Sequence, residues 1–124
     1  MNVKSDTKEK FHAITVAETI FTADMAAELN DLLLPYLHTD VKNIVLNLKE
    51  LRLLDVQAAE KLVKLQQNFY EKNASFVICG MQKEVEDFLD KTDLLELLNN
   101  APTESEAWDI VQMEEIERDL MDEV

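Results

Sequence analysis

The fold is decided by residues 43–65, which read NIVLNLKELRLLDVQAAEKLVKL. Residues 43–48 form a short apolar, β-branched run, which is typical of a central strand covered on both faces. After an apolar connector, residues 51–54, Asp55 stands where a helix N-cap belongs. Apolar residues then recur at helical spacing over residues 56–72, which predicts an amphipathic helix. The stretch therefore predicts a strand followed by a crossover helix, the unit from which parallel sheets are built.

Similar units precede and follow this stretch. Residues 10–16 alternate loosely between polar and apolar side chains, as a half-buried or edge strand does. Thr22 is a candidate N-cap for an amphipathic helix that cannot continue undisturbed through Pro35. Residues 75–79 predict another central strand, and Gly80, the only glycine of the chain, ends it. The pattern of strand and helix thus repeats three times.

The C-terminal part is helical in pattern. A helix around Val85 is followed by a leucine-rich segment, and Thr103 and Glu106 have the spacing of a capping box before a last helix. The element order predicts an α/β fold, with a small mixed β-sheet of four to five strands and helices packed against it. We expect one domain over residues 1–112 and an acidic C-terminal extension, helical or frayed, over residues 113–124.

The charge of the chain is strongly acidic and unevenly distributed. The formal net charge is −14, and the segment from Glu104 onward holds nine acidic residues and one basic residue. This field repels nucleic acids and anionic membrane surfaces, whereas a basic protein partner is compatible with it. The simpler interpretation is that the acidity keeps a small protein soluble. A lone cysteine, Cys79, and the lack of a signal peptide or a membrane-length apolar run favour the cytoplasm.

The sequence contains no pattern of a known catalytic, cofactor or metal site. A single glycine excludes GxGxxG, P-loop and GxSxG motifs, which need several glycines. His12, His38 and Cys79 lack the spacing of metal ligands, and we expect both histidines at the surface or at a strand edge. We therefore expect no enzyme activity and no cofactor.

Residues 43–65 resemble the STAS domain, the fold of bacterial anti-sigma factor antagonists. In that family an apolar strand leads into an Asp-Ser-Ser/Thr-Gly-Leu turn and then a helix, and here residues 55–59, Asp-Val-Gln-Ala-Ala, occupy the turn. The likeness continues with the strand and glycine of residues 76–80, the helix of residues 84–94, and the helix start of residues 103–107. Together these motifs cover residues 10 to 112.

The resemblance implies a protein-binding module whose usual switch is altered. In the family, a partner kinase that is also the anti-sigma factor phosphorylates the second hydroxyl residue of the turn. Gln57 occupies that position and Val56 the one before it, and neither can accept phosphate. We therefore expect a non-catalytic antagonist that is not regulated by phosphorylation at this turn.

The resemblance also implies where the partner, a kinase-like anti-sigma factor, would bind. The expected contact residues lie on the turn, on the first face of its helix and on a facing loop: Asp55, Val56, Gln57, Glu60, Lys61, Thr22 and Asp24. An alternative function is that of a small soluble STAS subunit that regulates an ABC or anion transporter. A third possibility is that the acidic tail docks on a basic protein through Ile116 and Leu120, although a frayed, solvated helix is the simpler interpretation.

Overall fold

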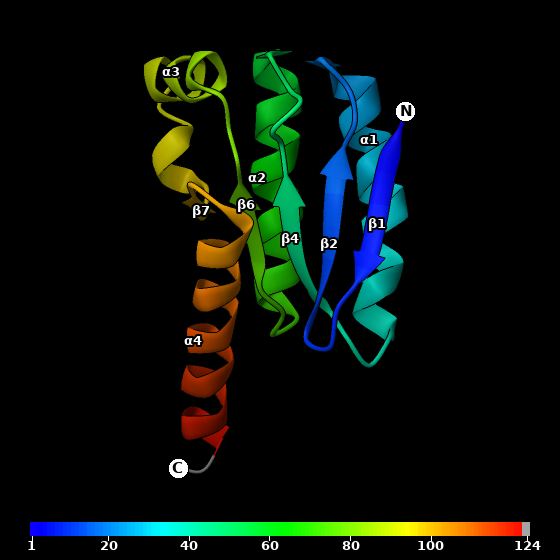
Figure 1. Ribbon diagram of the computed structural model, residues 1–124, viewed down its shortest axis with the longest axis vertical. Helices are drawn as coiled ribbons and strands as arrows, with labels where there is room; N and C mark the ends of the chain where they lie inside the picture. Colours follow the sequence, from blue (N-terminus) through cyan, green and yellow to red (C-terminus); the bar gives the residue numbers. More distant parts are fainter. Residues whose placement is uncertain (123–124) are drawn as a thin grey trace.

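The computed structural model describes residues 1–122, in which helices lie on both faces of a central sheet (Figure 1). The strands are β1 (Val3–Thr7), β2 (Phe11–Val16), β3 (Ile20–Phe21), β4 (Asn43–Asn47), β5 (Leu53–Leu54), β6 (Phe76–Cys79) and β7 (Asn100–Ala101). The α-helices are α1 (Ala23–Leu33), α2 (Val56–Glu71), α3 (Lys83–Lys91) and α4 (Glu104–Asp122), and two 3₁₀ segments are η1 (Leu34–His38) and η2 (Leu95–Leu97).

Five strands form the main sheet in the order β1-β2-β4-β6-β7. β1 runs antiparallel to β2, and every other neighbouring pair is parallel. The helices between the parallel strands provide the long connections that such pairs need. The prediction of an α/β fold with a small mixed sheet is therefore confirmed.

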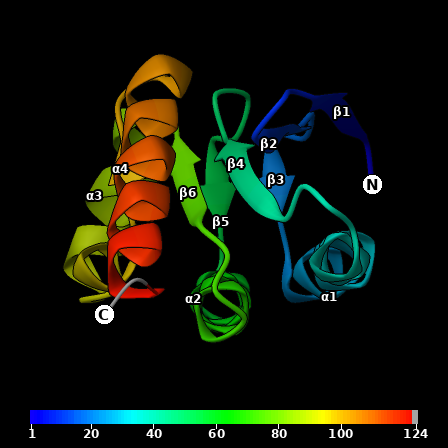
Figure 2. The ribbon, with the colours of Figure 1, turned by 90° about the horizontal axis from the view of Figure 1, so that it is seen from below.

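The two faces of the sheet are covered by different helices, which explains the continuous apolar runs of β4 and β6. Figure 2 shows α1 and α2 together on one side of the sheet, with α4 beside β6. Ile44 and Leu46 belong to the core under α1 and α2, whereas Val45 packs in a second core with Ala107 and Val111 of α4. Successive residues of a buried strand point to opposite faces, so both sets must be apolar.

The N-terminal strand β1 was not predicted, and its presence corrects two expectations. Because β1 pairs with β2 along its whole length, β2 is an inner strand and not an edge strand. His12 on β2 is consequently buried, contrary to the predicted position at the surface or at a strand edge. Its Nε2 lies 2.7 Å from the carbonyl oxygen of Val41, its Nδ1 lies 3.0 Å from Thr7 Oγ1, and its ring stacks on Tyr36.

The helix ends follow the residues that the sequence indicated. α1 ends at Leu33 and the chain continues as η1, in which Pro35 stands in the first turn, so the predicted break is present. α4 begins after Thr103, whose Oγ1 accepts a hydrogen bond from the backbone N–H of Glu106 at 3.2 Å. α4 then runs without interruption to Asp122, and the last two residues of the predicted extension, 123–124, lie outside the described part of the chain.

Candidate protein-binding site

The beginnings of α1 and α2 are brought together by a small second sheet. β3 and β5 pair in parallel, with Ile20 opposite Leu53 and Phe21 opposite Leu54. Each strand is followed at once by the N-cap of a helix, Thr22 for α1 and Asp55 for α2. Two parallel strands in register therefore place the two helix N-termini next to each other.

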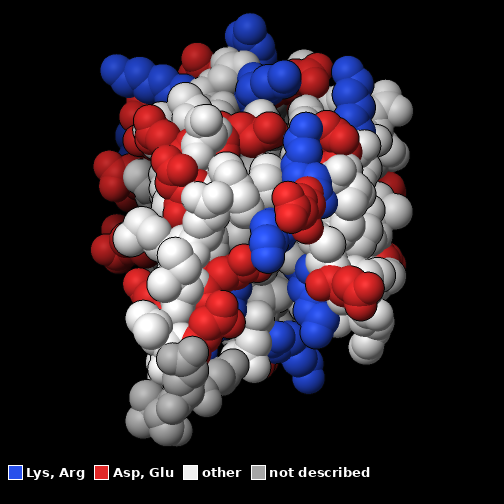
Figure 3. Space-filling model, turned by 60° about the horizontal axis from the view of Figure 1, so that its bottom comes forward, with Lys and Arg blue, Asp and Glu red and all other residues white. Residues whose placement is uncertain are grey.

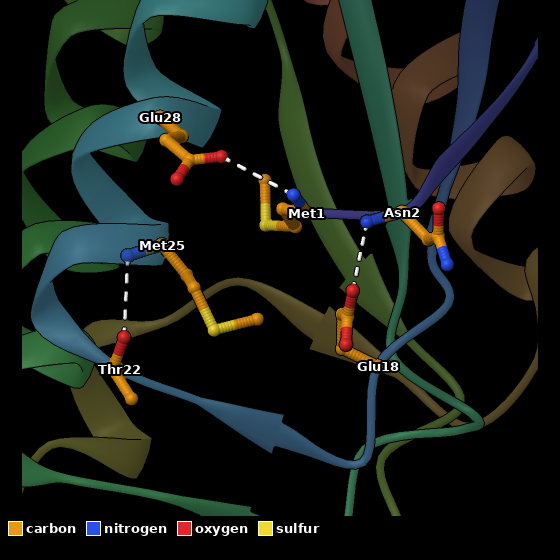
Figure 4. Close-up of polar contacts among 6 residues, drawn as sticks. All are labelled: Met1, Asn2, Glu18, Thr22, Met25 and Glu28. Carbon is orange, nitrogen blue, oxygen red and sulfur yellow. Dashed lines mark hydrogen bonds and ion pairs between the residues drawn. The ribbon is translucent and has the colours of Figure 1, made fainter.

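Each cap satisfies one of the free backbone N–H groups in the first turn of its helix. Asp55 Oδ1 accepts a hydrogen bond from the backbone N–H of Ala58 at 2.7 Å. Thr22 Oγ1 accepts one from the backbone N–H of Met25 at 3.3 Å (Figure 4). Serine, threonine and aspartate are preferred at this position because their short side chains reach these N–H groups.

The loop that leads to Thr22 is tied to the N-terminal strand. In Figure 4 the carboxylate of Glu18 accepts a hydrogen bond of 2.8 Å from the backbone N–H of Asn2. The N-terminal ammonium of Met1 lies 3.4 Å from the carboxylate of Glu28 on α1. These contacts link the two residues before β1 to the loop between β2 and β3 and to the second turn of α1.

The seven residues that the resemblance implied all lie at this end of the molecule, within the first two turns of α1 and α2 or at their caps. We call this set the rim: Thr22, Asp24, Asp55, Val56, Gln57, Glu60 and Lys61. All are exposed except Thr22, which is half-buried. Lys61 Nζ donates a hydrogen bond of 3.3 Å to the backbone carbonyl of Ala23, so a rim side chain of α2 reaches the start of α1.

Two further residues beside the rim were not predicted. Ile20 and Leu53 are 52% and 58% exposed, although both are large and apolar. They are cross-strand partners and point to the same face, and Val56, 40% exposed, follows in the first turn of α2. The apolar connector of residues 51–54 held a signal for this, because a strand that buries Leu54 must turn Leu53 outward.

The groups with altered acidity lie away from the rim and are poorly suited to chemistry. Burial raises the pKa of the Cys79 thiol to about 12, with a smaller contribution from the charge of Glu104, so the thiol stays protonated and unreactive. Burial and the hydrogen bond to Glu114 raise the pKa of Tyr70. Within residues 1–122, no group of acidic, histidine or cysteine side chains is arranged to hold a metal ion. None of the helices there is long and apolar enough to cross a membrane.

Removing the Asp55 cap should weaken the start of α2. We expect Asp55→Ala to lower the free energy of unfolding by about 1 kcal/mol, because the N–H of Ala58 loses its acceptor. Asp55→Asn keeps an acceptor and should change stability by only a few tenths of that amount. Urea denaturation of the three proteins measures the difference, and equal losses in both variants would contradict the capping role.

Three solved structures show the same fold at low sequence identity. An anti-sigma factor antagonist from Mycobacterium paratuberculosis has a TM-score of 0.74 at 13% identity, covering 90% of this chain and 93% of its own. The Bacillus cell fate determinant SpoIIAA in its phosphorylated form has a TM-score of 0.63 at 12% identity, covering 89% and 99%. The murine anion transporter Slc26a9 has a TM-score of 0.68 at 11% identity, covering 83% of this chain but only 18% of the transporter.

The sequence itself identifies the family. No curated protein sequence matches the chain. A family model described as the STAS domain, however, matches residues 2–107, which include β1, the rim and the start of α4. The match spans most of the chain and agrees with the fold of the three structures. The chain therefore belongs to the STAS domain family.

Proposed function

We propose that this protein is a non-catalytic, cytoplasmic binding module that acts as an anti-sigma factor antagonist through the rim. The observation that carries the proposal is the exposed apolar group of Ile20, Leu53 and Val56 beside the polar residues of the rim. An apolar centre flanked by polar groups is the usual composition of a protein–protein interface. The fold neighbours that are named anti-sigma factor antagonists support the choice of partner class.

Phosphorylation of the turn at residues 55–59 would not control this interaction. Gln57 and Val56 have no hydroxyl group, and Thr22, the only hydroxyl side chain of the rim, is half-buried and already accepts the hydrogen bond from Met25. The Gln57 amide is neutral and both donates and accepts hydrogen bonds, so it resembles an unphosphorylated hydroxyl group. Binding would then depend on the amount of partner, and not on phosphate at this turn.

A second candidate function is that of a regulatory subunit of a membrane transporter. It is supported by one observation, the similarity of this fold to part of the anion transporter Slc26a9. The same rim would then contact a transporter component in place of a kinase-like anti-sigma factor. The two functions are distinguished by identifying the protein that binds to the rim in the native cell.

The test is to isolate the partner from the native cell and to measure its dissociation constant for purified variants. Gln57→Glu adds a negative charge where the family carries phosphate, and we expect it to weaken binding about tenfold, by about 1.4 kcal/mol. An acidic residue in the first turn is favourable for a helix, so the loss would not come from unfolding of α2.

The matched control is Gln67→Glu, which makes the same change at another exposed position of α2, three turns from the N-terminus. It should leave the dissociation constant unchanged. If both variants bind as well as the unaltered protein, or both bind equally poorly, the rim is not the interface. Stoichiometric phosphate on a rim residue after incubation with the partner and ATP would refute control by partner amount.

A further inference from the structure

The second half of α4 has its polar and apolar faces reversed. In the first half, Ala107 and Val111 are buried against the sheet, as expected of a covering helix. After Val111 the side chains that face the body of the protein are charged, and the large apolar side chains point into solvent. This arrangement needs an explanation, because exposed apolar side chains in a continuous row are uncommon on a surface helix.

The charged inner face is firmly attached to the domain. Both carboxylate oxygens of Glu114 accept hydrogen bonds from the Tyr70 hydroxyl, at 2.7 and 3.0 Å, and Oε2 also accepts one of 3.2 Å from the Asn99 amide. Glu115 Oε1 accepts a hydrogen bond of 2.6 Å from the side-chain amide of Asn43. These contacts join α4 to α2, to the start of β4 and to the segment before β7.

One turn later the attachment continues. Arg118 donates a hydrogen bond of 3.1 Å to Ser75 Oγ and lies 3.5 Å from Asn43 Oδ1. Ser75 is fully buried immediately before β6, so the guanidinium group reaches into the body of the protein. The rotation of α4 about its own axis is therefore determined by polar contacts over two turns, and the opposite face is held toward solvent.

That opposite face carries three apolar side chains, which we call the outer stripe: Met113, Ile116 and Leu120. Their spacing of i, i+3 and i+7 places them along one side of the helix. Each of them is 59% or 60% exposed. The outer stripe has the pattern by which one amphipathic helix packs against another.

The charges next to the outer stripe are all negative. Asp109, Glu117 and Asp119 are exposed along the outer side of α4. Arg118, the only basic residue of the helix, is turned inward to Ser75. In Figure 3 the lower left of the surface, where α4 lies, is mainly red and white, whereas Lys and Arg gather toward the top, the centre and the right.

We propose that the outer stripe is a second docking surface, and that its partner presents an amphipathic helix whose apolar face is flanked by lysine or arginine. Charge complementarity selects this partner, because basic residues would pair with the acids along both sides of the stripe. A second copy of a chain with net charge −14 would instead bring like charges together. An anionic membrane surface is repelled for the same reason.

The outer stripe is separate from the rim. Figure 1 shows the N-termini of α1 and α2 at the top of the molecule, whereas α4 runs down to the opposite end. A partner on the outer stripe would leave the rim accessible, so two proteins can be held at once. The proposal therefore does not depend on the function of the rim.

The test uses two synthetic helical peptides of about 15 residues, a length at which an isolated helix is marginal and can form on binding. Both have the same leucine face, which is flanked by lysines in one peptide and by glutamates in the other. We expect the full-length protein to bind the lysine peptide in fluorescence anisotropy, more weakly as salt is added, and not to bind the glutamate peptide. The double variant Ile116→Ser with Leu120→Ser should weaken binding of the lysine peptide at least about tenfold.

The matched control is Leu32→Ser with Leu97→Ser, which removes two leucines that are 52% and 51% exposed on other elements. It should change the dissociation constant for the lysine peptide by less than about twofold relative to the unaltered protein. Absence of binding, or an equal loss in both double variants, would overturn the proposal. Sedimentation could instead show a dimer that only the stripe variant abolishes, which would assign the stripe to a second copy of the chain. Binding to lipid vesicles that only the stripe variant abolishes would assign the stripe to a membrane. Either result would also overturn the proposal.

Discussion

Replacing Gly80 with valine is expected to lower the free energy of unfolding by about 3 kcal/mol or more, one of the two largest effects that we predict. Gly80 has a φ of +72°, a left-handed conformation that β-branched residues strongly disfavour. A Cβ atom at this position would also lie 2.8 Å from Asn47 Oδ1, closer than atoms in van der Waals contact. Urea or thermal denaturation measures the loss.

Asn47 Oδ1 cannot move away freely, because it accepts a hydrogen bond of 2.9 Å from the backbone N–H of Lys49. The backbone carbonyl of Lys49 accepts a hydrogen bond of 2.7 Å from the side-chain amide of Gln82. These contacts join the loop after β4 to the loop after β6. Since the loop after β4 leads into β5 and the Asp55 cap, strain at Gly80 is also expected to disturb the rim.

A double-mutant cycle separates the crowding at Asn47 from the backbone strain. Gly80→Ala should cost about 2 kcal/mol in the unaltered protein and clearly less in the Asn47→Ala background, where the crowded oxygen is gone. The cost that remains is that of the left-handed backbone. An equal cost of Gly80→Ala in both backgrounds would show that crowding against Asn47 does not contribute.

The elements that could be predicted from sequence are those with strong local patterns. The runs that became β4 and β6 are short but mainly apolar, and α2 is long and has a clear helical periodicity. The caps Thr22 and Asp55 are marked by residue type. β1 was missed because its five residues, VKSDT, are mostly polar and exposed. β7 has only two residues and exists because it pairs with β6, so no local pattern could reveal it.

For the candidate site, the sequence led to the polar residues of the rim and to Val56, but not to the exposed Ile20 and Leu53. A cap or a missing hydroxyl group is visible in a single residue such as Asp55 or Gln57. An apolar residue such as Leu53, in contrast, has the same letter whether it is buried or exposed, and its direction depends on the pairing of β3 with β5. The outer stripe shows the same limit, because polar contacts from Asn43 and Ser75, far away in sequence, decide which side of α4 faces solvent.

Because of these long-range contacts, we expect Asn43→Asp to lower the free energy of unfolding by about 3 kcal/mol at neutral pH. Asn43 is buried, and its amide donates to the carbonyl of Lys10 at 3.0 Å and to Glu115 at 2.6 Å. Its oxygen accepts from the backbone N–H of Ser75 at 2.8 Å and lies 3.5 Å from the Arg118 guanidinium. The aspartate keeps an oxygen that can accept from Ser75. The amide group that donated hydrogen bonds is replaced by a carboxylate oxygen, which then faces the carbonyl oxygen of Lys10 and the carboxylate of Glu115.

The reason for the loss can be tested with a compensating change on α4. Glu115→Gln in the Asn43→Asp background should recover about 1 kcal/mol, because the new amide can donate a hydrogen bond to the new carboxylate in place of the carboxylate repulsion. In hydrogen exchange, Asn43→Asp should also speed exchange in the turns around Glu115 and Arg118 more than in α2. If α4 stayed as protected as α2 while global stability fell, Asn43 would not be what holds the second half of α4. The outer stripe would then owe its direction to other contacts of that helix, chiefly those of Glu114 with Tyr70 and Asn99.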